Sequence, residues 1–212
     1  MAKARPNPTH KILSWMMDSN YVTDLITQNV DNLHRAAATQ PNNEHIVELH
    51  GSLFQVECLD CHSTIPREDF QRRLFARNPS WGSLLPEKPK INPDGDVELP
   101  EHMSYATFDI PPCTSCSSRR MKPQVVFFGE SIKPHVTSEA EAMVRRSEGV
   151  LVVGSSLATY SSYRLVRLAR ELHKPVGIIC QGNTRADALA SWKVTMGCTP
   201  VLQRVQQQLQ EE

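Results

Sequence analysis

The 212-residue sequence has no apolar run approaching the 18 residues of a membrane-spanning helix, and its formal net charge is zero. The first absence excludes a transmembrane helix, and the second gives no argument for a nucleic-acid or membrane partner. No two of the nine glycines are separated by a single residue, so the chain has no Gly-x-Gly phosphate loop. It also has no Gly-x-Ser-x-Gly elbow of the kind that serine hydrolases use.

Cysteine occurs in a pattern that indicates a metal. Four of the six cysteines form two C-x2-C pairs, and four thiolates in such pairs are the ligand set of a tetrahedral zinc site. That set leaves no open position for water, so we predict one structural Zn²⁺ held by Cys58, Cys61, Cys113 and Cys116. A reduced dithiol pair or a redox motif is the alternative, and the adjoining His62 could replace a cysteine.

The other two cysteines, Cys180 and Cys198, are expected in or near apolar strands as small buried hydrophobes. This usage favours a reducing or matrix compartment over a secreted disulfide framework. The start of the chain, Met1–Lys11, is basic and free of acids, as in a transit peptide. It has too few serines for one and continues into an amphipathic segment, so we interpret it as part of the folded domain.

Helical and strand patterns alternate outside the segment between the cysteine pairs. Capping residues and apolar stripes predict helices at 7–20, near 67–77, from a Ser138–Glu141 capping box onward, and around Leu165–Leu172 before Pro175. Runs rich in β-branched residues predict strands at 21–27, 125–128, 149–153 and 176–179. Alternation of this kind implies a parallel sheet with helices on its faces.

The segment between the cysteine pairs differs in composition. Long helices and central strands are excluded by its prolines, at Pro79, Pro86, Pro89, Pro93, Pro100, Pro111 and Pro112. Asp94-Gly95-Asp96 adds a turn signal. We therefore predict an α/β fold, an incomplete Rossmann-like parallel sheet with helices on both faces and a small inserted zinc-binding module. The Rossmann-like parts would be 1–57 and 121–212, and the module 58–120.

Small and amide residues follow four of the predicted strands. They are Gln28 and Asn29, Gly129 and Glu130, Gly154 to Ser156, and Gln181 and Gly182. In an open parallel sheet, ligands bind in the crevice outside the carboxyl ends of the strands. Glycine and serine end many strands, so each group alone is weak evidence, but together they favour a nucleotide-sized ligand.

His50 is the candidate general base, because an imidazole titrates near neutral pH. The alternative is a histidine that only packs or lies on the surface, and seven others occur in the chain.

Several motifs together resemble one family. They are Thr27-Gln28-Asn29-Val30-Asp31, Glu48-Leu49-His50-Gly51, the two C-x2-C pairs, Val125-Val126-Phe127-Phe128-Gly129-Glu130, and Gly154-Ser155-Ser156-Leu157 with Tyr160. In this order they resemble the sirtuins (Sir2 family), which are NAD-dependent protein-lysine deacylases. Asn78-Pro79-Ser80-Trp81 and Pro93-Asp94-Gly95-Asp96-Val97 are similar to the mitochondrial, sirtuin 4-like class.

The resemblance implies a role for each motif. His50, Asn29 and Asp31 would be catalytic, with His50 deprotonating an NAD ribose hydroxyl after nicotinamide has left. NAD would be bound by Gln28, Asn29, Val30, Asp31, Gly154, Ser155, Ser156, Cys180, Gln181, Gly182 and Cys198. An acyl-lysine protein or peptide would pair by strand addition with Val125, Val126, Phe127, Phe128 and Gly129. The acyl group would pass from lysine to ADP-ribose, and the enzyme would thus be a transferase.

The chain departs from the family pattern in two places. Cys180 stands where the pattern has an asparagine that bonds a ribose, and the Gly-Ala-Gly-x-Ser loop with its strand is absent. That loop would hold the NAD diphosphate through several charge-assisted hydrogen bonds, each worth roughly 1.5–3 kcal/mol. We therefore expect an amino-terminally truncated deacylase with impaired NAD binding.

Two other functions stay open at this point. One is a catalytically inactive, zinc-stapled binding module, and the other is an NAD-dependent protein ADP-ribosyltransferase that uses the same pocket. By resemblance we expect the mitochondrial matrix as the compartment, with the cytoplasm or nucleus as the alternative.

Overall fold

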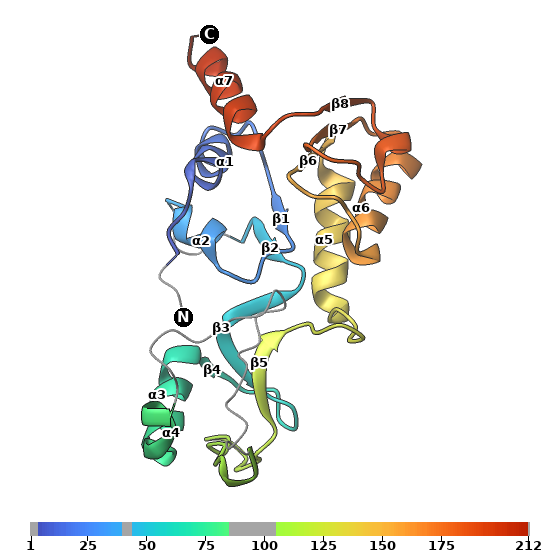
Figure 1. Ribbon diagram of the computed structural model, residues 1–212. Helices are drawn as coiled ribbons and strands as arrows, with labels where there is room; N and C mark the ends of the chain where they lie inside the picture. The colour runs from blue at the N-terminus through green and yellow to red at the C-terminus, as the bar shows by residue number, and fades with distance from the viewer. Residues whose placement is uncertain (1–3, 40–43, 85–104, 212) are drawn as a thin grey trace. The chain divides into compact units, whose positions relative to one another are not determined.

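The computed structural model describes residues 4–39, 44–84 and 105–211 (Figure 1). It divides into two compact units, one made of Met1–Gly51 with Val126–Glu212 and the other of Ser52–Val125. The sequence predicts a zinc-binding module at 58–120. These domain bounds remain a prediction, separate from the division into two compact units. The Asp94-Gly95-Asp96 turn and the prolines from Pro86 to Pro100 lie outside the described residues. Among the described helices, none is long and apolar enough to cross a membrane.

Parallel strands form two short sheets in the first unit. β1 (Leu25–Thr27) pairs with β2 (Ile46–Glu48), and β7 (Val176–Ile179) lies between β6 (Val150–Val153) and β8 (Trp192–Val194). All four residues of β7 are buried, as expected for a central parallel strand covered on both faces. Parallel strands that alternate with helices confirm the predicted Rossmann-like α/β class.

Helices pack on both faces of β7. They are α1 (Pro8–Asp18), α5 (Pro134–Arg146), α6 (Tyr160–Glu171) and α7 (Cys198–Glu211). The short helix α2 (Leu33–Ala37) contacts α1, and a 3₁₀ turn covers Asp187–Leu189. Ile178 belongs to the apolar cluster of α5 and α6, whereas Ile179 belongs to that of α1 and α7. Because successive side chains of a strand point to opposite faces, these helices cover opposite sides of the sheet.

The capping of α1 follows from the sequence, but the strand after it is shorter than predicted. Asn7 Oδ1 accepts the backbone N–H of His10 (3.1 Å), and Pro8 occupies the first helical position. The backbone N–H groups of Tyr21 and Val22 turn back to the Met16 carbonyl (2.9 and 3.1 Å). These two residues close the end of α1, so the strand predicted at 21–27 is reduced to Leu25–Thr27.

Two other predicted element bounds are wrong. α5 begins at Pro134, a residue whose fixed φ suits a first turn, and Ser138 lies inside the helix rather than capping it. The strand predicted at 125–128 ends at Val125, because β5 spans Met121–Val125. The chain then turns: the Glu130 N–H donates to the Phe127 carbonyl (3.0 Å), and Gly129 has φ +88°, which favours glycine.

The end of the first unit was not predicted at all. β8 is only three residues long, and α7 starts at Cys198, where we expected a cysteine in or near a strand. Trp192 of β8 lies against Gly177 of β7, where an added Cβ would overlap the indole ring. This close approach explains a glycine inside a fully buried strand.

The second unit is a small sheet with two helices. Its strands β3 (Gly51–Cys58), β4 (Thr64–Pro66) and β5 lie in the order β4-β3-β5, and α3 (Arg67–Arg77), α4 (Pro79–Leu84) and a 3₁₀ turn (Tyr105–Thr107) complete it. Asn78 is 5% exposed and ties α3 to a distant segment. Its Nδ2 donates to the carbonyls of Leu74 (2.8 Å) and Asp109 (2.9 Å), and its Oδ1 accepts the Asp109 N–H (2.8 Å).

Candidate functional site

The four cysteines assigned to a metal lie together in the second unit. Their sulfur atoms are all within 4.8 Å of one another. The sulfurs of Cys58 and Cys116 are 3.6 Å apart, as are those of Cys61 and Cys113. Tetrahedral zinc with bonds of about 2.3 Å places its sulfurs about 3.8 Å apart, so this group fits one such ion. His62 instead contacts Glu57, with Nδ1 at 3.2 Å from Oε1.

Each C-x2-C pair is shaped by the same backbone turn. In the first turn, the His62 N–H donates to the Cys58 carbonyl and the Cys58 N–H to the Ser63 carbonyl, both at 3.0 Å. The same two hydrogen bonds recur in the second turn between Cys113, Ser117 and Ser118, at 3.0 and 2.7 Å. His62 and Ser117, the residues that follow each pair, have φ of 59° and 62°. The repeated turn explains how two four-residue segments, far apart in the sequence, direct four sulfurs to one point.

The close contacts among the four sulfurs give the cysteine thiols different pKa values. Hydrogen bonds from the Ser63 hydroxyl and from the backbone of Cys116 and Ser115 lower the pKa of Cys113 to about 5. The backbone of Ser118 favours the thiolate of Cys116, but its contact with Cys61 and burial outweigh this and raise its pKa to about 12. A divalent cation would compensate the repulsion that four thiolates suffer, because its charge favours every deprotonated ligand.

The carboxyl ends of β1 and β6 meet in the first unit through side-chain hydrogen bonds. Gln28, directly after β1, donates from Nε2 to Ser155 Oγ (2.8 Å), directly beyond β6. Gln28 Oε1 accepts the hydroxyl of Thr159 (2.9 Å), which precedes α6. The structure thus brings together two of the four strand-end groups that the sequence singled out.

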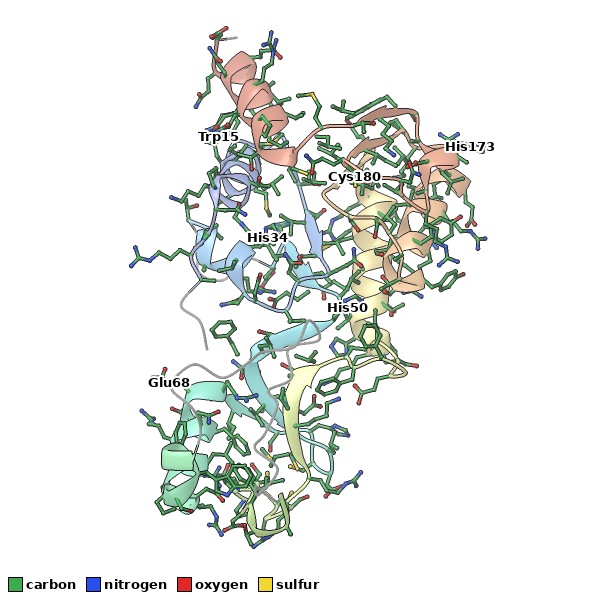
Figure 2. All side chains as sticks on the ribbon, viewed as in Figure 1. Trp15, His34, His50, Glu68, His173 and Cys180 are labelled. Carbon is green, nitrogen blue, oxygen red and sulfur yellow. The ribbon has the colours of Figure 1, made fainter. Side chains whose placement is uncertain are left out.

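His50 lies beside this pair, at the end of the segment that follows β2 (Figure 2). Its Nδ1 is 3.2 Å from the Gln28 carbonyl oxygen, and its Nε2 is 3.0 Å from Ser161 Oγ. Its own carbonyl accepts the Val126 N–H (2.9 Å). The half-buried imidazole is therefore held from both nitrogens next to a polar strand end.

The rest of the Thr27–Asp31 motif forms a turn between β1 and α2. The Asn29 N–H donates to Thr27 Oγ1 (3.1 Å) and its side chain is exposed, while Val30 is half-buried. Asp31 Oδ1 accepts the Leu33 N–H (3.0 Å), which fixes the carboxylate at the start of α2. Asn29 therefore has an accessible amide, whereas Asp31 also supports the local backbone.

Two histidines lie close to Asp31. The rings of His10 and His34 have centroids 4.5 Å apart (His34 is labelled in Figure 2). Burial, and then the neighbouring His10, lowers the pKa of His34 to about 4, although Asp31 opposes the shift. Burial also lowers the pKa of His10, again against Asp31. Both rings are therefore neutral near pH 7 and pack as uncharged groups.

The Gly154–Ser156 turn is shaped by its glycine. Gly154 has φ +64°, and an added Cβ would lie 3.2 Å from Cys198 Sγ. Ser155 Oγ also accepts the Leu157 N–H (3.1 Å), while Ser156 is exposed and its carbonyl accepts the Arg185 N–H (2.9 Å). A side chain at position 154 would therefore be strained, and it would crowd the sulfur of Cys198.

The predicted adenosine-side residues lie after β7 and at the start of α7. Cys180 is half-buried and its N–H donates to the Val194 carbonyl (3.1 Å), whereas Gln181 and Gly182 are exposed. Cys198 Sγ is 3.6 Å from the Ile179 carbonyl oxygen. Burial, with a smaller contribution from Cys180, raises the pKa of the Cys198 thiol, so it is a neutral group at physiological pH.

The predicted peptide-pairing segment is partly a turn. Val125 ends β5, and the backbone N–H of Phe127 donates to Glu130 Oε2 (3.0 Å) within the turn that follows. Phe127 and Phe128 are 52% and 103% exposed. Both aromatic side chains therefore expose apolar area beside the end of β5.

Two residues of the hydrogen-bond network were not predicted from the sequence. Thr159 and Ser161 lie immediately after the Gly154–Leu157 motif, and their hydroxyls contact Gln28 and His50. Serine and threonine before an amphipathic helix are common as caps, so their residue types alone do not indicate a site. Their position at the carboxyl side of a strand was the signal that could have found them.

Comparison with known proteins identifies the family. The Sir2 family model matches residues 1–161, so the chain belongs to the Sir2 family. It is 41% identical over 202 residues to the Drosophila melanogaster NAD-dependent protein deacylase Sirt4, covering 95% of this chain and 62% of that protein. It is 40% identical over 198 residues to the Bos taurus NAD-dependent protein lipoamidase sirtuin-4, mitochondrial, covering 93% and 60%. The chain thus spans less than two thirds of the length of these relatives.

A solved structure supports the fold. The complex described as Sir2-p53 peptide-NAD+ superposes with a TM-score of 0.74 at 24% identity, covering 99% of this chain and 72% of that chain. At this identity the likeness concerns the fold alone, and it agrees with the Rossmann-like sheet described above.

Proposed function

We propose that this chain carries the base and the nicotinamide side of an NAD-dependent protein-lysine deacylase. The observation that supports this most directly is the placement of His50 against Gln28 at the carboxyl ends of parallel strands. A histidine with one nitrogen held by a carbonyl is fixed in one tautomer, as a general base requires. The proposal agrees with the names of the deacylase and lipoamidase relatives.

The polar groups around the crevice fit a ribose and an amide. Gln28, Ser155 and Thr159 offer amide and hydroxyl groups at one strand edge, and Gly154 keeps side-chain atoms away from it. Asn29 adds an exposed amide on the same turn. When bound, NAD supplies the ADP-ribosyl group that accepts the acyl group as nicotinamide leaves. Ser156, Cys180, Gln181, Gly182 and Cys198 would border its adenosine half.

His50 would take the proton from a ribose hydroxyl. Its Nδ1 faces a carbonyl, which only accepts, so Nδ1 carries the hydrogen and Nε2 is the basic nitrogen. Asn29 and Asp31 would line the nicotinamide and ribose side, with Asp31 fixed by the Leu33 N–H. Val30, between them, would contribute apolar contact.

An acyl-lysine peptide is the proposed substrate. Strand addition would use the backbone at Val125 and Val126, and Phe127, Phe128 and Gly129 form the exposed turn beside them. The four cysteines would hold one structural zinc, because their spacing fits four thiolates and leaves no position for water. We propose the mitochondrial matrix as its compartment, and the name of the bovine relative, which includes the word mitochondrial, supports this.

The test is the conversion of an acyl-lysine peptide with NAD⁺, followed as nicotinamide and deacylated peptide. We expect His50→Ala to lower kcat at least a hundredfold, since general-base catalysis contributes about 10²–10⁴. His135→Ala, which removes an exposed histidine on α5, is the matched control and should keep the wild-type rate.

Activity that survives His50→Ala would contradict the base assignment. Nicotinamide release without deacylated peptide, accompanied by ADP-ribose on protein, would instead support the transferase alternative.

A further inference from the structure

Both ring nitrogens of His50 have defined partners, and one partner fixes the tautomer. Nδ1 lies 3.2 Å from the Gln28 carbonyl oxygen, which can only accept a hydrogen bond. The neutral ring therefore carries its hydrogen on Nδ1 and has a lone pair on Nε2. Ser161 Oγ lies 3.0 Å from that nitrogen, so its hydroxyl donates to it.

The Ser161 hydroxyl has a second acceptor within reach. Thr159 Oγ1 lies 3.1 Å from Ser161 Oγ. The hydrogen of Thr159 is already used on Gln28 Oε1 (2.9 Å), so Thr159 Oγ1 faces Ser161 as an acceptor. The single hydrogen of Ser161 can thus point either to His50 or to Thr159.

We infer that Ser161 is a positioning residue for His50 that pairs with its Nε2 in both protonation states, with Thr159 as the alternate acceptor. This inference rests on the proposed role of His50 as the base. When the Ser161 hydrogen turns to Thr159 Oγ1, the Nε2 lone pair is free to take a proton from a ribose hydroxyl, and the new N–H then donates to Ser161 Oγ. His50 gains the proton that the ribose hydroxyl loses, and neither Ser161 nor Thr159 gains or loses one.

Helix capping does not account for these hydroxyls. Thr159 is the N-cap residue of α6, yet its side chain makes no capping hydrogen bond. Its Oγ1 is directed to Gln28 instead. Ser161 lies in the first turn and directs its hydroxyl to His50 rather than to the backbone. The start of α6 is thus built around the imidazole and the amide, and its hydroxyls hold the ring between two elements.

Nitrogen NMR of ¹⁵N-histidine-labelled protein tests the hydrogen-bond assignment without requiring activity. Long-range ¹H–¹⁵N spectra separate the two neutral tautomers, and His50→Gln identifies the His50 signals among the eight histidines. We expect the Nδ1–H tautomer above the titration, with an Nε2 signal that moves in Ser161→Ala and returns in Ser161→Thr. An Nε2–H tautomer in the wild type, or an Nε2 signal unchanged in Ser161→Ala, would overturn the inference.

Steady-state deacylation tests the consequence. A lost hydrogen bond to a charged group corresponds to a kcat lower by about ten- to hundredfold in Ser161→Ala. We expect KM for NAD to change little, the acid limb of the pH–rate profile to move to lower pH, and Ser161→Thr to restore most of the rate. Ser162→Ala is the control, because the Ser162 hydroxyl contacts Thr159 and not His50; its pH profile should match the wild type.

The outcomes separate this inference from the proposed function. A wild-type chain without deacylase activity removes the proposed function, and the tautomer and Ser161 response in NMR then decide the pairing alone. An active wild type whose rate and pH profile are unchanged in Ser161→Ala overturns the positioning role and leaves the base assignment of His50 intact.

Discussion

The cysteine cluster and the strand-end residues Gln28, His50, Ser155 and Thr159, which line the proposed crevice, bring polar atoms together over very different sequence distances. Each C-x2-C turn is closed by its own backbone, with His62 bonded to Cys58 and Ser117 to Cys113. The crevice joins Gln28 to Ser155 and Thr159, more than a hundred residues away, through side chains alone. Each half of the cysteine cluster is thus shaped by residues close to it in the sequence. The crevice, in contrast, forms only when the sheet and α6 have assembled.

This difference predicts how each site fails. Each C-x2-C turn should keep its shape until the metal ion or a cysteine is lost. The second unit should then lose the metal–sulfur bonds that stabilise it most. The crevice should instead lose function in small steps, because each hydrogen bond is one of several that hold Gln28 and His50.

The largest expected effect is the loss of zinc. Cys113→Ser removes one of four ligands, and structural zinc is worth about 10–16 kcal/mol in small modules, which is comparable with the 5–15 kcal/mol stability of a typical domain. We expect the zinc content to fall from one per chain to none and the second unit to unfold. Metal analysis and far-UV circular dichroism measure both.

Cys180→Ser is the control for that change, because Cys180 lies after β7 and outside the cysteine cluster, and it should keep one zinc. A zinc content of one in Cys113→Ser would contradict the four-thiolate site.

A smaller effect is expected at the crevice. Gln28→Ala removes the hydrogen bonds to Ser155 and Thr159 and should lower the free energy of unfolding by about 1–3 kcal/mol. The zinc content should stay at one, since this change leaves both cysteine turns intact. Chemical denaturation checks the first expectation and metal analysis the second.

Gln207→Ala removes an exposed glutamine of α7 that bonds only the neighbouring turn, and it should change stability by less than about 0.5 kcal/mol. If Gln28→Ala and Gln207→Ala lowered the free energy of unfolding equally, the hydrogen bonds of Gln28 would stabilise the protein no more than those of an exposed side chain.

The sequence predicted structure correctly where neighbouring residues determine it. The C-x2-C spacing selected four cysteines whose sulfurs lie together, the Asn7-Pro8 start located α1, and the apolar run at 176–179 located β7. Element bounds failed where tertiary contacts decide them. Tyr21 and Val22 close α1 instead of starting a strand, and Phe127 turns back through Glu130.

The crevice could be predicted only in part. The rule that ligands bind at strand ends selected Gln28 and Ser155 before their contact was known. It could not select Ser161, because nothing in the local pattern relates that serine to a histidine 111 residues earlier. The roles of His50, Asn29, Asp31 and the peptide segment stay predictions that the kinetic experiments test.

The most direct test of the central claim, that the crevice at Gln28 and His50 is a nucleotide site, is a thermal melt of the zinc-loaded chain over a titration of NAD⁺. A ligand at about 100 times its Kd stabilises the native state by about 2.7 kcal/mol, so the account predicts a midpoint that rises with NAD⁺ and rises less in Gln28→Ala. A cooperative melt whose midpoint does not move at millimolar NAD⁺ would contradict it.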